Sequence, residues 1–190
     1  MLKQLKPTLI LFAFFTVLTG LIYPAVITAI SQVVFPHQAN GSLISHNGQV
    51  VGSELIGQQF SDPKYFWGRL SDTGSTPYDA SNSAGSNYSV LNPNLQKQVE
   101  DRIAALKAAD PTNTLPIPAD LVTASASGLD PNISIAAAQY QAGRVARLRG
   151  LTLDQVNALI VRYTTGRFLE FIGEPRVNVL ELNLALDGLK

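Results

Sequence analysis

The chain has 190 residues, with 14 Lys and Arg balanced by 14 Asp and Glu, and it contains no cysteine. This balance gives no excess of basic charge for binding nucleic acid, so nucleic acid is not an expected partner. The lack of cysteine excludes disulfides, thiolate metal sites and a cysteine nucleophile. The length suits one membrane anchor and one modest domain held together by its own core.

The stretch 8–35 contains no charged residue over 28 positions. As a helix it would be about 42 Å long, against a bilayer hydrocarbon core of about 30 Å, so it can span with some tilt or a kink. Pro24 has no amide hydrogen and is expected to supply the kink. We therefore predict a cytoplasmic N-terminus over 1–7, a transmembrane helix over 8–35 and a single domain over 36–190.

Basic residues near the ends of the span predict its orientation. Lys3 and Lys6 precede it, and the next basic residue is Lys64. Positive residues stay on the cytoplasmic side, so the domain is expected outside the membrane. A cleaved signal peptide is the alternative. The apolar run is longer than the usual 7–15 residues of such a peptide, and its nearest small-residue cleavage pattern, Ala29-Ile30-Ser31, is poor.

Small residues recur every four positions along the span, at Thr16, Gly20, Pro24 and Thr28. Small side chains at this spacing allow a second helix to approach closely. The stripe predicts a packing face for a partner helix. The alternative is that small residues are simply common in membrane helices.

The segment 57–94 is rich in Gly, Pro, Ser and Asn and follows neither a strand nor a helix period. Its six aromatic residues argue against disorder, because disordered segments are poor in aromatics. We predict ordered loops that form a contact surface, with Tyr65, Phe66 and Trp67 as anchors.

The remaining segments predict short elements. Asn47-Gly48 is a strong hairpin turn signal. Helices are expected over 95–109, over 134–149 with Ser134 as N-cap, and over 152–166 with a Thr152–Gln155 capping box. Short strands are expected at 121–123 and 177–179, whereas 181–186 fits either a strand or a helix. The predicted fold class is α+β, with one N-terminal transmembrane helix followed by a single domain outside the membrane.

Two patterns resemble catalytic motifs. Asp72 lies in an Asp-Thr-Gly-Ser run like that of aspartic proteases, but this chemistry needs two carboxylates and the run occurs once. Ser125 and Ser127 precede Gly128, yet the G-x-S-x-G pattern is absent. A turn is the simpler explanation of each motif. We expect neither a catalytic residue nor a metal site.

Three arginines cluster near the end of the helix predicted over 134–149: Arg144, Arg147 and Arg149. Arginines can hold a phosphate or an acidic partner. The simpler explanation is that cations near a helix C-terminus interact favourably with its dipole.

Several segments, taken in chain order, match one known family. They include Leu18-Thr19-Gly20, Gln38-Ala39-Asn40-Gly41-Ser42, Leu55-Ile56-Gly57-Gln58, Gly85-Ser86-Asn87, Val177-Asn178 and the run 121–130, LVTASASGLD. The chain resembles the C subunit of the bacterial Kdp potassium-transporting ATPase. Ser125, Ser127, Gly128 and Asp130 belong to the signature run. The family often has His where this chain has Trp67, so the resemblance carries over no role for an imidazole there.

The resemblance implies an accessory subunit, needed for assembly and activity, in the bacterial inner membrane. It implies two partners, a channel-like subunit that conducts potassium and a P-type ATPase subunit. It also implies a transient association with ATP that raises ATP affinity, without a tightly bound cofactor. A domain outside the membrane cannot touch cytoplasmic ATP, so we expect that effect to be indirect. The alternatives are a membrane-tethered envelope hydrolase and a stand-alone envelope binding protein.

Overall fold

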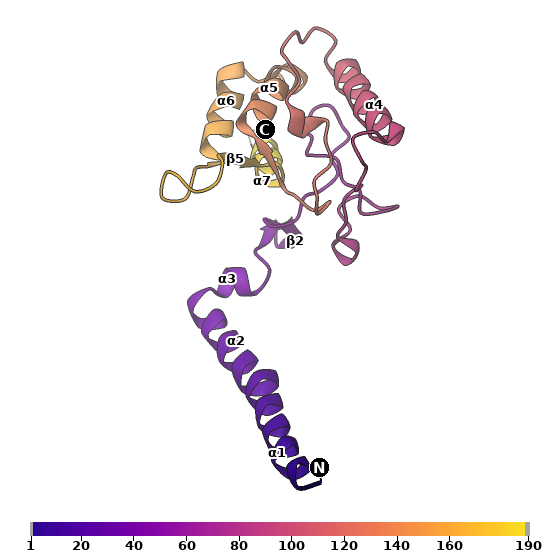
Figure 1. Ribbon diagram of the computed structural model, residues 1–190. Helices are drawn as coiled ribbons and strands as arrows, with labels where there is room; N and C mark the ends of the chain where they lie inside the picture. Colours follow the sequence, from indigo (N-terminus) through magenta and orange to yellow (C-terminus); the bar gives the residue numbers. More distant parts are fainter. Residues whose placement is uncertain (1, 189–190) are drawn as a thin grey trace. The chain divides into compact units, whose positions relative to one another are not determined.

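The computed structural model describes residues 2–188 and divides into two compact units, 1–43 and 44–190 (Figure 1). The first unit is helical. It comprises α1 (Leu2–Val17), a π-helical turn (Leu18–Ile22), α2 (Tyr23–Val34) and α3 (Pro36–Ala39). The continuous stretch Lys3–Val34 is long and apolar enough to cross a membrane.

The π-helical turn lies directly before Pro24. The Tyr23 N–H bonds to the carbonyl of Leu18, five residues back. Pro24 cannot donate the next backbone hydrogen bond, and a wider turn is one way in which a helix accommodates that loss. The helix starts before residue 8 and includes Lys3, since lysine is a good helix former. It ends at Val34, one residue earlier than predicted and two residues before a proline.

The predicted hairpin is present. β1 (Leu43–His46) pairs with β2 (Gln49–Ser53). The two turn residues, Asn47 and Gly48, have φ of 52° and 79°, as a two-residue turn with both residues in the left-handed region requires.

Three helices and a small sheet form the centre of the second unit. They are α5 (Ile135–Arg149), α6 (Leu153–Arg162), α7 (Val179–Asp187) and the antiparallel strands β3 (Asn132–Ser134), β5 (Arg176–Asn178) and β4 (Thr164–Thr165), in that sheet order. The predicted Ser134 cap of α5 and the Thr152–Gln155 capping box of α6 are confirmed, and Gly150, with φ 67°, closes α5.

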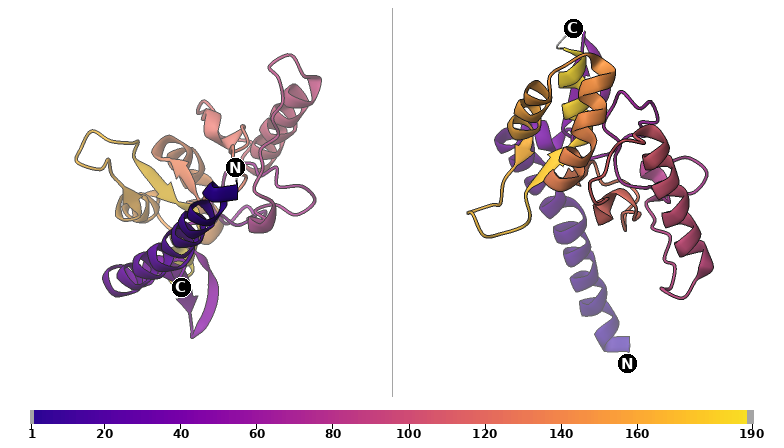
Figure 2. Two further views of the ribbon diagram at one scale, coloured as in Figure 1. Left: turned by 60° about the horizontal axis from the view of Figure 1, so that its bottom comes forward. Right: turned by 90° about the horizontal axis from the view of Figure 1, so that it is seen from above.

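Helix α4 (Pro93–Ala109) lies to one side of this centre, across from α6, in both Figure 1 and Figure 2. Its apolar residues Leu95, Val99 and Ile103 are half-buried, whereas Leu106 is fully buried. Irregular chain runs between α4 and the other helices, and it includes two 3₁₀ turns, Ala80–Asn82 and Ala119–Leu121.

The buried core joins the helices to this irregular chain. Its largest apolar members are Phe66, Trp67, Leu106, Leu121, Ile133, Tyr140, Val145, Val156, Ile160, Val177, Val179, Leu182 and Leu186. The mixture of helices and short strands agrees with the α+β prediction.

Two predicted elements are wrong. The strand at 121–123 is a 3₁₀ turn that begins after Pro118, and Thr123 closes it by donating its backbone N–H and its hydroxyl to the Ala119 carbonyl. The helix over 152–166 ends at Arg162, because Thr164 and Thr165 pair with β5 instead. The ambiguous 181–186 is helical and lies within α7.

Candidate functional site

Two side-chain amides hold the aromatic segment 65–67 much as a neighbouring strand would. Asn183 on α7 accepts a hydrogen bond from the Phe66 N–H at 2.9 Å and donates one to the Phe66 carbonyl at 3.0 Å. Gln141 on α5 makes the same two contacts with Trp67, at 2.8 and 3.1 Å. Buried backbone groups need partners, and here amide side chains supply them. We call this arrangement the amide clamp.

Arg144, also on α5, holds the same segment through hydrogen bonds from its side chain. Its guanidinium donates to the carbonyls of Pro63 and Tyr65, and at 2.7 Å to Gln141. It also lies 4.7 Å from the centroid of the Trp67 ring, a favourable cation–π distance. Burial lowers the pKa of Arg144 to about 10, which leaves it charged at neutral pH.

A second arginine contacts the same ring. The Arg102 guanidinium on α4 lies 5.1 Å from the Trp67 ring centroid. It donates to the carbonyls of Gly68 at 2.8 Å and Leu121 at 2.9 Å. Burial lowers its pKa as well. Arg102 therefore links α4 to both the aromatic segment and the 3₁₀ turn.

Tyr65 lies at the edge of the clamp and is half-buried. Its hydroxyl donates to the Asp187 carboxylate at 3.0 Å. The Arg149 guanidinium lies 4.6 Å from its ring centroid and forms an ion pair with Asp187 at 2.9 Å. Two of the clustered arginines, Arg144 and Arg149, are thus committed to holding the aromatic segment.

The signature loop, residues 121–130, packs along the long irregular segment. Its backbone pairs with three separated points of that segment: Ser125 N–H with Leu70 O at 3.0 Å, Ala84 N–H with Ser127 O at 3.1 Å, and Gly57 N–H with Leu129 O at 2.9 Å. Arg69 adds a side-chain link, with an ion pair to Asp130 at 3.2 Å and a hydrogen bond to the Ala124 carbonyl at 3.2 Å. The structure therefore brings the signature loop and the aromatic segment together through Arg69.

Gly128 lies at one of the tightest points of this packing. Its φ of 68° favours glycine, and a Cβ atom there would come nearer than 3.0 Å to the Thr73 side chain and the Ala84 carbonyl. The Ser71 hydroxyl donates to the Gly128 carbonyl at 2.7 Å. The small residue is required by the close approach of the two loops.

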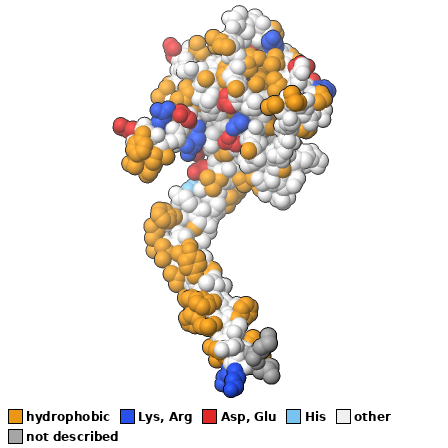
Figure 3. Space-filling view, in the orientation of Figure 1, with side chains coloured by type: hydrophobic (Ala, Val, Ile, Leu, Met, Phe, Trp, Pro, Cys, Tyr) orange, Lys and Arg blue, Asp and Glu red, His pale blue; other side chains and the backbone are white. Residues whose placement is uncertain are grey.

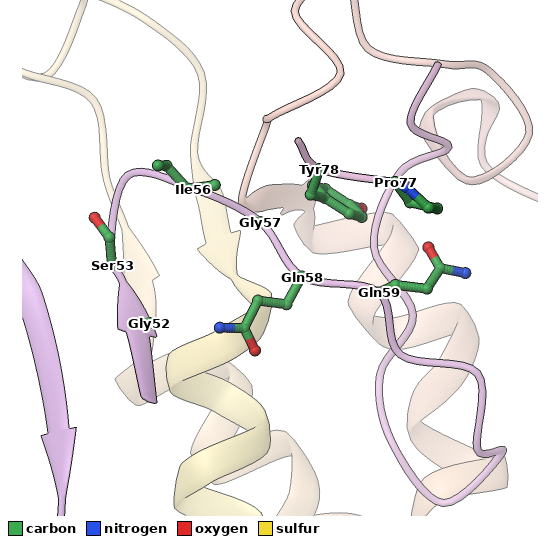
Figure 4. Close-up of a pocket in the computed structure, with 8 residues that line it drawn as sticks. All are labelled: Gly52, Ser53, Ile56, Gly57, Gln58, Gln59, Pro77 and Tyr78. Carbon is green, nitrogen blue, oxygen red and sulfur yellow. The ribbon is translucent and has the colours of Figure 1, made fainter. Parts of the chain in front are cut away.

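A pocket of about 320 Å³ opens beside these loops (Figure 4). It is lined by Gly52, Ser53, Ile56, Gly57, Gln58, Gln59, Pro77 and Tyr78. The side chains of Gln58 and Gln59 point to opposite sides of the loop, and Gln58 donates to the Val51 carbonyl at 2.6 Å. Burial raises the pKa of Tyr78 to about 12, and its hydroxyl donates to the Arg69 carbonyl. The residues that line this pocket therefore include no acid or base that titrates near neutral pH.

The residues that resembled catalytic motifs have structural contacts. Asp72 accepts two hydrogen bonds from the Gln98 amide of α4, at 2.8 and 3.0 Å. The Ser127 hydroxyl accepts from the Leu129 N–H at 3.1 Å and closes a turn. The buried Ser125 hydroxyl has no hydrogen-bond partner among residues 2–188, so no general base is hydrogen-bonded to it.

Within the same described range, no three His, Asp or Glu side chains gather as a metal site would require. The site is a network of packed loops rather than a cluster of reactive groups.

Comparison with known proteins identifies the family of the chain. A family model described as the K+-transporting ATPase c chain, KdpC, matches residues 5–188. The chain belongs to the KdpC family. Proteins named potassium-transporting ATPase KdpC subunit are similar over nearly their whole length. The one from Herpetosiphon aurantiacus is 63% identical over 185 residues, covering 97% of this chain and 96% of the relative. The one from Methylococcus capsulatus is 57% identical over 190 residues, covering both chains fully.

The sequence reasoning that led to the KdpC family missed Gln141 and Asn183, and it singled out Arg144 only as one of three clustered arginines. Gln141 and Asn183 are 1% exposed, and Arg144 is 2% exposed. On the helices, Ala137 and Ala138 lie one turn before Gln141, and Val179 and Leu186 lie one turn from Asn183; all four are buried. A polar side chain at a core position must be paired, and that signal could have identified all three.

Proposed function

We propose that the chain is a non-catalytic accessory subunit of a high-affinity, ATP-driven potassium uptake complex. Membership of the KdpC family over residues 5–188 carries this proposal, because the relatives are named as subunits of a potassium-transporting ATPase. Its partners would be a channel-like subunit that conducts potassium and a P-type ATPase subunit. The direct test is purification through a tag on the full chain from detergent-solubilised membranes. Both partners are expected to copurify, and their absence would contradict the proposal.

The N-terminal helix is proposed to dock on a membrane helix of a partner through Thr16, Gly20, Pro24 and Thr28. The Thr16 hydroxyl donates to the Phe12 carbonyl at 2.7 Å, so its polar group is satisfied within the helix. At Gly20, a Cβ atom would meet nothing within 4 Å, which leaves a notch for another backbone.

Thr16→Leu combined with Gly20→Leu should fill this notch and release the subunit from the complex. Leu11→Phe combined with Leu18→Phe is the matched control, because at 100° per residue these positions lie on the other side of the helix. An intact complex with normal transport in the first variant would refute docking through this face.

The domain is proposed to lie outside the cytoplasm, over the outer potassium entrance of the channel-like subunit. The support is the placement of Lys3 and Lys6 before the span, with no further basic residue until Lys64. Reporter fusions at the two ends of the chain test this: a reporter active only in the cytoplasm should work at the N-terminus and fail at the C-terminus.

Any effect of the chain on ATP affinity is then proposed to act through the assembled complex. The contacts of Asp72 and Ser127 support a structural role for both residues. Asp72→Ala and Ser127→Ala should leave ATP-driven potassium uptake in place once the complex has assembled. Loss of uptake with normal assembly would favour the hydrolase alternative instead.

A further inference from the structure

A loop of residues 166–175, between β4 and β5, exposes four large apolar side chains. Phe168 is 69% exposed and Phe171 is 74% exposed, while Leu169 and Ile172 are 63% and 49% exposed. The loop extends away from the rest of the domain in all three ribbon views (Figures 1 and 2). In Figure 3 an orange group flanked by red and blue side chains occupies its position. Exposed apolar groups of this size mark interaction sites.

The loop is held in one shape by its own backbone. Phe168 and Ile172 each donate an N–H to the other's carbonyl, both at 2.9 Å. Leu169 and Glu170 have φ of 51° and 68°, and Gly173 has φ of 83°. Two consecutive non-glycine residues in the left-handed region are strained, and such strain gathers at functional sites. The apolar side chains are therefore presented on a shaped knob, which loses little conformational entropy on docking.

Charge distinguishes the base of the loop from its tip. At the base, Arg167 and Glu174 form an ion pair at 2.8 Å. At the tip, Glu170 stands between Leu169 and Phe171 and has no ion-pair partner among the described residues. The tip therefore combines a wide apolar surface with one unpaired negative charge.

We propose that the 166–175 loop docks into an apolar socket, lined with a basic side chain, on a protein subunit of the complex. The proposal rests on the proposed function, which supplies the partner subunits. A protein socket suits the tip because it can place a guanidinium or ammonium against Glu170 while burying the aromatic rings. A lipid surface suits it less, because the carboxylate would enter the headgroup region beside the rings and repel anionic lipid.

Cysteine labelling tests this docking, since the natural chain contains no cysteine. Phe171→Cys is labelled with a water-soluble maleimide in the full chain alone and in the assembled complex, both in the same detergent. Leu115→Cys is the matched control, because Leu115 is 56% exposed and lies outside both the 57–94 segment and the 166–175 loop. The expected result is labelling about tenfold slower in the complex at Phe171→Cys, with no change at Leu115→Cys, because an interface core excludes water.

Three outcomes would overturn the proposal. One is equal labelling of Phe171→Cys in chain and complex. Another is equal protection of both cysteines. The third is equal protection of Phe171→Cys when the chain alone is placed in phosphatidylglycerol-containing vesicles, which would make the bilayer the occupant. Copurification of both partner subunits, measured in the same preparation, separates failure of this docking from failure of the proposed function.

Glu170→Lys provides a second measurement that leaves the apolar surface in place. It should reduce the retention of the subunit in the purified complex about tenfold, because like charges across an interface repel. Glu174→Lys, at the base, is the control and should have little effect. Equal retention of both variants would contradict the predicted basic socket.

Discussion

Two irregular loops of this domain, around residues 65–67 and 166–175, both carry aromatic side chains, but only the first loop buries them. Phe66 and Trp67 are 0% and 7% exposed, whereas Phe168 and Phe171 are 69% and 74% exposed. The first pair has the amide clamp and two arginines to satisfy its backbone and cover its rings. Around the second pair, the backbone hydrogen bonds lie within the loop itself, between Phe168 and Ile172. Burial of a loop thus depends on polar partners for its main chain as much as on its apolar side chains.

The largest expected effect separates the two loops directly. Phe66→Ala should lower the free energy of unfolding by about 4 kcal/mol, because it empties a fully buried site. Phe171→Ala should change it by no more than about 0.5 kcal/mol. Unfolding of the full chain in detergent can be followed by the fluorescence of Trp67, its single tryptophan. Similar values for the two variants would refute the difference in burial.

A glycine pair compares the surroundings of the signature loop with those of the 166–175 loop at similar φ angles. Gly128 has φ 68° and Gly173 has φ 83°. Gly173→Ala should cost about 1 kcal/mol, the price of a left-handed alanine, since its Cβ would meet nothing within 4 Å. Gly128→Ala should cost about 3 kcal/mol, because its Cβ would also collide with the opposing loop. Denaturant unfolding of both variants measures the difference, and equal losses would argue against the tight packing.

The amide clamp itself should make a smaller contribution. Asn183→Ala should lower the free energy of unfolding by about 2 kcal/mol, because it leaves the Phe66 N–H and carbonyl without partners. Gln96→Ala removes an exposed amide and is the control, with an expected change within about 0.5 kcal/mol. A red shift of Trp67 fluorescence should accompany only the first substitution. An unchanged spectrum and stability would show that the aromatic rings hold themselves in place.

The smallest effect concerns pH at α7, the helix that supplies Asn183. Burial, and then the nearby charge of Glu54, raise the pKa of Glu181 above its ordinary 4.5. A raised acid pKa means that the folded state binds the proton more readily, so stability should fall as pH rises from 4.5 through the folded pKa. Glu181→Gln should flatten this slope. The melting temperature measured between pH 4.5 and 7 checks it, and an identical slope would contradict the shift.

Short sequence patterns correctly predicted the turns and helix caps that depend on neighbouring residues. The Asn47-Gly48 turn, the Ser134 cap and the Thr152 capping box depend on residues within a few positions of one another. The helix signal over 152–166 failed at its end because Thr164 pairs with Val177, a partner on β5 that no local pattern reveals. The extended pattern at 121–123 failed because Pro118 and Thr123 close a turn there.

The site depended on distant partners and was only partly predictable. The aromatic content of 57–94 indicated an ordered segment, and Phe66 and Trp67 are buried within it. Nothing near them in sequence indicated that Gln141, Asn183 and Arg144 would hold their backbone. The resemblance to the KdpC family located the signature run, whereas its contacts with Arg69 and Leu70 became visible only in three dimensions.

The amide clamp also has a consequence for how the protein is made. Phe66 and its partner Asn183 are 117 positions apart in the chain. Until α7 has been synthesised, the nascent domain lacks half of the clamp, and contacts of such long sequence separation form late. The aromatic segment 65–67 therefore lacks its full set of partners until α7 has been synthesised. During that interval it is a natural target for chaperones, and a ribosome that stalls before α7 would leave an aggregation-prone intermediate.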